Sequence, residues 1–296
     1  MSEKIFDKMN VILVKIEKND LMSFLVDKDI TNSSCRECRT KELIDAVVRT
    51  IPEYVFAQYE NPEIPQTNVV DKLREAANQL HSVEKLTTSD TTRKHSGDFG
   101  ELLLHLLLRD FKGTTPLISK VYFRDTNNVA AHGFDAVHIS PEEKILWLGE
   151  SKFYADDKKG ISALISDLDD HINREYLNQQ FLIIKKNVEN NSIPGRDEWI
   201  KILTECSKLE DKLDLINIPM LCTYEHDIYS KFDNLNTREA IEYHESNIFA
   251  LKSYFDSKNT HKLRNNLNIV LFLFPIKDKK ELEDAFEDRL LHMQQI

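Results

Sequence analysis

Two short apolar segments on either side of a polar turn constrain the fold of this chain more than any other feature. Apart from their charged residues, residues 133–138 and 144–152 are mostly apolar, and the Ser-Pro-Glu-Glu stretch at 140–143 lies between them. Apolar runs of this length around a turn predict a β-hairpin. Pairing the two strands about this turn would place Asp135 roughly opposite Glu150, with facing Cβ atoms about 5 Å apart.

Three charged side chains interrupt the apolar pattern of the hairpin. Because strand side chains alternate between faces, Glu150 and Lys152 point the same way and Ser151 points the other way. Burying such charges without partners would cost roughly several kcal/mol. A hard divalent cation held between Asp135 and Glu150 would offset that cost. The alternative is an ordinary hairpin edge, in which Lys152 simply pairs with the carboxylates.

The rest of the chain predicts an alternation of helices and strands. From residue 96 the apolar spacing indicates a helix, three strands, a helix, a strand, a helix, a strand and a final helix. The strands after the hairpin are expected at 218–224 and 267–275. The second of these contains a continuous apolar run at 269–274, which is typical of a central strand. We therefore expect an α/β fold.

Residues 1–92 are expected to form a smaller α/β region, separate from a core at 93–296. A strand is predicted at 11–16, and helices are predicted at 41–59 and 69–86. The polar, Thr-rich stretch at 87–94 is the best linker candidate. If the protein works together with a partner, this N-terminal region is the expected module for docking it or for regulation.

The net charge limits the partners of this protein. Lys and Arg number 39 against 50 Asp and Glu, which gives a formal charge of −11. A protein that holds nucleic acid unaided usually shows a basic excess, so this chain would need a local basic patch or a basic partner. The sequence has no apolar run of about 18 residues and no secretory start. We therefore expect a cytoplasmic protein that does not engage a membrane.

The four cysteines are sparse, which suggests a reducing compartment. Cys35 and Cys38 form a single CxxC, and no second pair follows at zinc spacing. A surface loop is therefore expected there in place of a zinc site.

A further carboxylate lies in the first turns of the helix that begins near residue 96. Glu101 follows Gly100, and a glycine at that position lets another backbone or a ligand come close. Glu101 could act with the hairpin carboxylates, or it could merely complement the helix dipole.

These residues together resemble the PD-(D/E)xK nuclease superfamily. The acidic residue of its second core strand corresponds to Asp135, and its E-x-K corresponds to Glu150-Ser151-Lys152. Some members add a helix glutamate, which Glu101 matches. More narrowly, residues 100–101, 133–138 and 149–154 look like HamA, the nuclease subunit of the Hachiman antiphage defence system. Gly133-Phe134 stands where the superfamily often has proline, which lowers the specificity of the motif.

The resemblance implies a restriction-endonuclease-like core, with a mixed central sheet flanked by helices, that cuts DNA. Asp135, Glu150 and Glu101 would hold Mg²⁺ or Mn²⁺, which supplies Lewis acidity. Lys152 would position the attacking water or stabilise the developing charge. DNA would be presented by a HamB-like helicase partner. The alternative is a catalytically inactive scaffold or nucleic-acid-binding subunit of the same fold, although retention of all four residues favours an enzyme.

Overall fold

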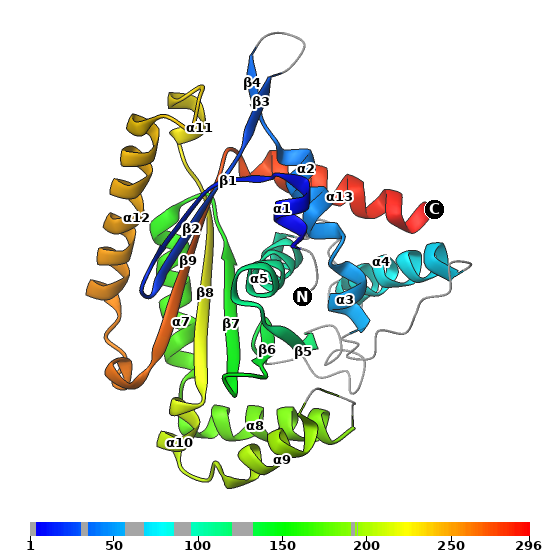
Figure 1. Cartoon of the computed structure of the whole chain (residues 1–296), viewed down its shortest axis with the longest axis vertical. Helices are drawn as coiled ribbons and strands as arrows, with labels where there is room; N and C mark the ends of the chain where they lie inside the picture. Colours follow the sequence, from blue (N-terminus) through cyan, green and yellow to red (C-terminus); the bar gives the residue numbers. More distant parts are fainter. Residues whose placement is uncertain are drawn as a thin grey trace.

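A seven-stranded mixed sheet forms the centre of the molecule. The computed structural model describes residues 4–30, 35–56, 68–85, 96–119, 133–190, 193 and 195–296. The strand order of the sheet is β1-β2-β9-β8-β7-β6-β5, and helices cover both of its faces (Figure 1). The expected α/β fold with a mixed central sheet flanked by helices is confirmed.

The sheet strands are β1 (Ile12–Lys18), β2 (Leu21–Val26), β5 (Thr115–Ser119), β6 (Ala136–Ser140), β7 (Ile145–Phe153), β8 (Ile216–Glu225) and β9 (Asn268–Ile276). A separate two-stranded ribbon comprises β3 (Lys28–Ile30) and β4 (Arg36–Cys38). The helices are α1 (Ile5–Met9), α2 (Thr40–Val48), α3 (Ile51–Phe56), α4 (Val69–Lys85), α5 (Ser96–Lys112), α7 (Asp157–His171), α8 (Arg174–Asn190), α9 (Arg196–Glu205), α10 (Leu209–Asp214), α11 (Ile228–Lys231), α12 (Arg238–Lys258), the 3-10 helix η2 (Arg264–Asn266) and α13 (Lys279–Gln295).

The strands divide into a parallel part and an antiparallel part. β2, β9, β8 and β7 run parallel to one another, whereas β5, β6 and β7 form an antiparallel meander. Parallel strands are covered on both faces and therefore favour continuous apolar runs. This explains why β9 is buried from Val270 to Ile276.

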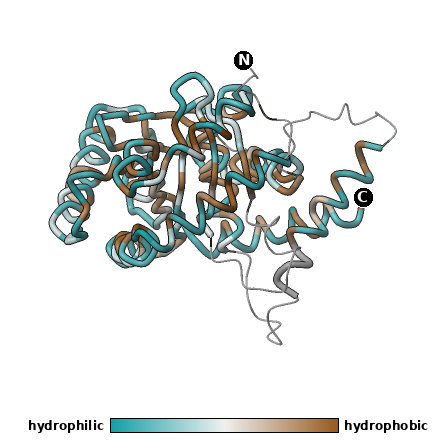
Figure 2. Tube along the Cα trace, turned by 90° about the horizontal axis from the view of Figure 1, so that it is seen from below, coloured by the Kyte–Doolittle hydropathy of each residue, from teal (hydrophilic) through white to brown (hydrophobic). Residues whose placement is uncertain are grey.

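Each face of the sheet has its own hydrophobic core, and β7 contributes to both. Leu146 and Leu148 pack into a core that includes residues of α7, α8 and α12. Trp147 and Phe153 pack into a second core with residues of α2, α5 and α13. The apolar segments gather in the middle of the trace and the polar ones lie outside (Figure 2). The period of two along β7 thus decides which helix each side chain meets.

Strands of the N-terminal region belong to the central sheet. β1 pairs antiparallel with β2, and β2 pairs parallel with β9, where Leu21 lies opposite Leu271. The expected linker at 87–94 lies outside the described residues, and a functional division at 92/93 stays a prediction. The single helix expected at 41–59 is two helices, α2 and α3, which meet around Thr50, whose hydroxyl donates to the carbonyl of Val47 at 2.7 Å.

Two other expectations differ from the structure at their ends. The apolar spacing of residues 199–216 predicts a single helix, but α9 and α10 lie there instead, and Ile216 already begins β8. The sequence at 117–123 predicts the first of the three strands after residue 96; the structure describes β5 at Thr115–Ser119, and residues 120–123 lie outside the described part of the chain. Among the helices that the structure describes, none is both long and apolar enough to cross a membrane.

Candidate active site

The hairpin of β6 and β7 positions the two carboxylates expected from the sequence. Ala136 pairs with Gly149, and extending this register by one residue brings Asp135 level with Glu150. β6 begins at Ala136, so β7 runs past it. The backbone N–H of Ser151 donates to Oδ2 of Asp135 at 2.9 Å, and the Ser151 hydroxyl donates to the same oxygen at 2.9 Å. The Asp135 carboxylate therefore accepts the backbone N–H of β7 at the point where β6 no longer pairs with it.

Helices α5 and α7 cover opposite faces of β7 at this point (Figure 1). Glu150 and Lys152 contact α7. Ser151 lies on the other face, where a Cβ built on Gly100 of α5 would be 3.3 Å from its Oγ. Glycine at position 100 is thus required for the close approach of α5 to the strand. Glu101, one residue further along α5, comes to the site from the face opposite Glu150.

A cavity of about 480 Å³ opens beside these residues. Three of the four expected site residues line it, namely Glu101, Asp135 and Lys152, whereas Glu150 lies outside its wall. Its other lining residues are Gly97, Ser151, Phe153, Tyr154, Ala155 and Lys279.

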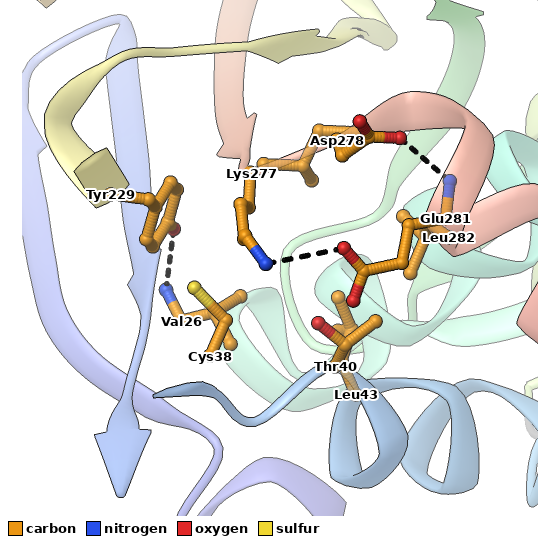
Figure 3. Close-up of a pocket in the computed structure, with 10 residues that line it drawn as sticks. Val26, Cys38, Thr40, Leu43, Tyr229, Lys277, Asp278, Glu281 and Leu282 are labelled. Atoms are coloured by element: carbon orange, nitrogen blue, oxygen red, sulfur yellow. Dashed lines mark hydrogen bonds and ion pairs between the residues drawn. The ribbon is translucent and has the colours of Figure 1, made fainter. Parts of the chain in front are cut away.

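A second cavity lies between β2, β4, β9 and α13 (Figure 3). Its volume is about 20 Å³, which is room for roughly one water molecule. Tyr229 lines it, accepts from the backbone N–H of Val26 and donates to the carbonyl of Pro275, both at 3.1 Å. The cavity of about 480 Å³ is the candidate site for a substrate, because three of the expected site residues line it.

Glu101 is held by a residue of the N-terminal region. The hydroxyl of Tyr54, on α3, donates to Oε2 of Glu101 at 2.6 Å, and both side chains are buried. Burial, followed by the negative charge of Glu101, raises the pKa of Tyr54 well above its ordinary value. Tyr54 therefore keeps its proton and remains a hydrogen-bond donor to the carboxylate.

Glu150 is nearly inaccessible, with 3% of its surface exposed. Burial, and then the charge of Asp135, raise the pKa of Glu150 to about 7. Nδ1 of His171 lies 2.6 Å from Oε1 of Glu150. Burial alone would lower the pKa of His171, but the hydrogen bond to Glu150 outweighs it, so the net shift is upward. The two groups share a hydrogen bond that keeps a proton between them near neutral pH.

Lys152 is ion-paired with Asp167 of α7. Burial would lower the pKa of Lys152, but its hydrogen bond to Asp167 and that carboxylate's charge outweigh this, and the pKa is raised. Lys152 therefore carries a full positive charge at neutral pH and lies on the cavity wall.

The donor chemistry of the site suits a hard divalent cation. Asp135 and Glu150 are both buried, and the charge of Asp135 raises the pKa of Glu150. A cation bound to the pair would relieve this repulsion, and carboxylate oxygens are the ligands that Mg²⁺ prefers. Within the described residues, no cluster of three or more His, Cys, Asp or Glu side chains is already arranged around one point. The fit thus rests on the two hairpin carboxylates, with Glu101 facing the same cavity.

His138 of β6 and the Cys35–Cys38 pair lie away from this chemistry. His138 is buried and hydrogen-bonded to His105 at 3.1 Å and to Thr114 at 2.8 Å. Burial holds the pKa of His138 well below its ordinary value, so the ring is neutral. Cys35 is exposed, Cys38 is half-buried, and neither forms a disulfide.

Sequence reasoning missed three residues of the site. Asp167 and His171 hold Lys152 and Glu150, and Tyr54 holds Glu101. For Asp167 and His171, the sequence did hold a signal, namely an Asp-x-x-x-His pattern in the helix directly after the E-x-K strand. Tyr54 has no such local signal, because its contact depends on how α3 packs against α5.

Comparison with known protein families gives a match to one of them. The sequence model of the HamA family matches residues 3–290, which is nearly the whole chain. No curated protein matches the chain.

Proposed function

The chain belongs to the HamA family, and from this premise we propose that it is a metal-dependent DNA endonuclease of the Hachiman antiphage defence system. The observation that supports this most is the convergence of Glu101, Asp135 and Lys152 on one cavity, with Glu150 buried beside Asp135. Carboxylates of this kind are suited to hold a metal, and a neighbouring ammonium is suited to stabilise a phosphate in reaction.

Each residue has a defined task in this proposal. Asp135 and Glu150 would hold Mg²⁺ or Mn²⁺, which supplies Lewis acidity toward a phosphate oxygen when bound. The protonated Lys152 stabilises the negative charge that develops on the scissile phosphate. Glu101, fixed by Tyr54, adds a third carboxylate to the cavity wall.

DNA reaches the site through a partner. The formal charge of −11 opposes binding of a polyanion by the isolated chain. The cations on the cavity wall, Lys152 and Lys279, already form ion pairs with Asp167 and Glu283. We infer that a HamB-like helicase supplies most of the DNA affinity and delivers the strand to the cavity.

The test is degradation of plasmid DNA by the full chain in Mg²⁺, with and without the helicase and ATP. Removing one electrostatic group of an active site typically slows the reaction about 100-fold to 1000-fold. We expect losses of this size for Glu150→Ala and Lys152→Met, whereas Lys201→Met, an exposed lysine of the remote helix α9, should cut normally. Equal cutting by the wild type and both site variants would refute this site. Absence of Mg²⁺-dependent cutting under all these conditions would favour an inactive scaffold.

A further inference from the structure

Helix α7 carries two side chains that engage both functional residues of the E-x-K segment. Asp167 forms an ion pair with Lys152, and Nδ1 of His171 lies 2.6 Å from Oε1 of Glu150. The same helix therefore provides a carboxylate for the ammonium and an imidazole for the carboxylate.

The spacing of the two pairs explains why one helix can hold both. Asp167 and His171 are four residues apart, so they share a helix face and are separated by about 6 Å along the axis. Glu150 and Lys152 are two residues apart on β7, which is about 6.6 Å along a strand. Because α7 follows β7 and packs back along it, the earlier helix residue meets the later strand residue.

The imidazole is fixed by its surroundings. The His171 ring stacks on Tyr176, with centroids 4.5 Å apart and planes 11° apart, and meets the ring of Phe134 edge-on at 5.7 Å. Phe134 directly precedes Asp135 in the chain. A ring held on two sides presents Nδ1 in one direction, and so fixes the orientation of the Glu150 carboxylate.

The ammonium of Lys152 has competing partners. Besides Asp167, it experiences the negative charges of Asp135 and Glu150. If Asp167 lost its charge, the strongest remaining attraction would be toward the two hairpin carboxylates. The ammonium would then occupy the space between the groups that are suited to bind a cation.

We propose that Asp167 and His171 are positioning residues that keep the hairpin carboxylates ready for a divalent cation. His171 orients Glu150, and Asp167 holds Lys152 away from Asp135 and Glu150. The inference rests on the proposed function for the identity of the reaction, but it concerns cation binding, which is measured without DNA. Partners that orient metal-binding groups typically change metal affinity about 10-fold to 100-fold when they are mutated.

Calorimetric titration of the full chain with Mn²⁺ tests the proposal. Asp167→Asn and His171→Ala should each weaken Mn²⁺ binding about 10-fold to 100-fold. His171→Asn should restore most of the affinity lost in His171→Ala, because the amide nitrogen takes the place of Nδ1. Asp170→Asn is the matched control, since Asp170 is an exposed residue of the same helix; it should bind Mn²⁺ as the wild type does. Thermal melts verify that every variant is folded.

The double variant Asp167→Asn/Lys152→Met shows whether Asp167 acts by holding Lys152 in place or only by supporting the fold. Without the Lys152 ammonium, that cation no longer competes with Mn²⁺ for the carboxylates, so Mn²⁺ affinity should return to at least the wild-type value. Wild-type affinity in Asp167→Asn, or equally weak binding in the single and double variants, would overturn the role of Asp167. A wild-type chain that binds no Mn²⁺ would overturn the whole inference. A chain that binds Mn²⁺ with the expected pattern but cuts no DNA would overturn the proposed function alone.

Discussion

Asp135 and Ser151 are joined by two hydrogen bonds to a single carboxylate oxygen, one from the backbone N–H and one from the hydroxyl, each 2.9 Å long. Ser151 is the variable position of the E-x-K motif, between Glu150 and Lys152. Its backbone bond is available to any residue, whereas its hydroxyl bond is specific to this side chain. The relationship ties the start of β6 to the functional segment of β7.

Ser151→Ala removes one of the two bonds and leaves the other. A hydrogen bond to a charged group is worth about 1.5–3 kcal/mol, and the remaining backbone bond should limit the loss. We expect plasmid cleavage to slow about 10-fold, because the Asp135 carboxylate loses one of the two Ser151 hydrogen bonds that orient it. Ser162→Ala, in an exposed position on α7, is the control. Unchanged cleavage in Ser151→Ala would show that the backbone bond suffices.

Gly100→Ala probes the close approach of α5 to the same serine. A Cβ at position 100 would lie 3.3 Å from Ser151 Oγ, so the hydroxyl must shift by a few tenths of an ångström. Gly100→Ala should therefore reduce cleavage. In the Ser151→Ala background, Gly100→Ala should slow cleavage less than it does in the wild type. The difference corresponds to a coupling energy of about 0.5–3 kcal/mol between the two positions. Additive effects would contradict this coupling.

Tyr54→Phe removes the hydroxyl that donates to Glu101 at 2.6 Å. We expect about 10-fold slower cleavage and a loss of about 1–3 kcal/mol in the free energy of unfolding, because a buried carboxylate loses a donor. Tyr229→Phe is the matched control, since Tyr229 is a buried tyrosine whose hydroxyl bonds belong to the smaller cavity (Figure 3). It should lose comparable stability and keep its cleavage rate. Parallel losses of cleavage in both variants would indicate a general effect of destabilisation.

Glu150→Gln should change how stability depends on pH in the absence of divalent cations. The pKa of Glu150 is about 7 in the folded protein against an ordinary value of 4.5, so between these values the folded chain binds more protons than the unfolded chain. Stability therefore falls as pH rises through this window, by up to about 3 kcal/mol. The raised pKa of His171 acts in the same direction, because its stabilising proton is also lost as pH rises.

The glutamine variant carries no charge at this position at any pH. It should therefore unfold at a higher temperature than the wild type at pH 8, and the difference should become small at pH 4.5, where Glu150 is protonated in the folded chain and only about half ionised in the unfolded chain. Melting curves followed by circular dichroism measure the two transitions. A difference of equal size at both pH values would contradict burial of the Glu150 charge.

Local periodicity determined those parts of the fold and site that depend only on neighbouring residues. The period of two placed Glu150 and Lys152 on one face of β7, and the turn at 140–143 set the register that brings Asp135 level with Glu150. The helical stripe after residue 96 placed Glu101 near the start of α5. Strand β2 was missed because its six residues are all buried and show no alternation.

Only the tertiary structure decided which groups surround these residues. Glu101 comes from the helix on the opposite face of β7, and it lines the same cavity as Asp135 and Lys152. Asp167 and His171 meet the E-x-K segment because α7 folds back along β7. Contacts of this kind depend on how whole elements pack, and packing is set by the two cores on either side of the sheet, to which residues from distant parts of the chain contribute.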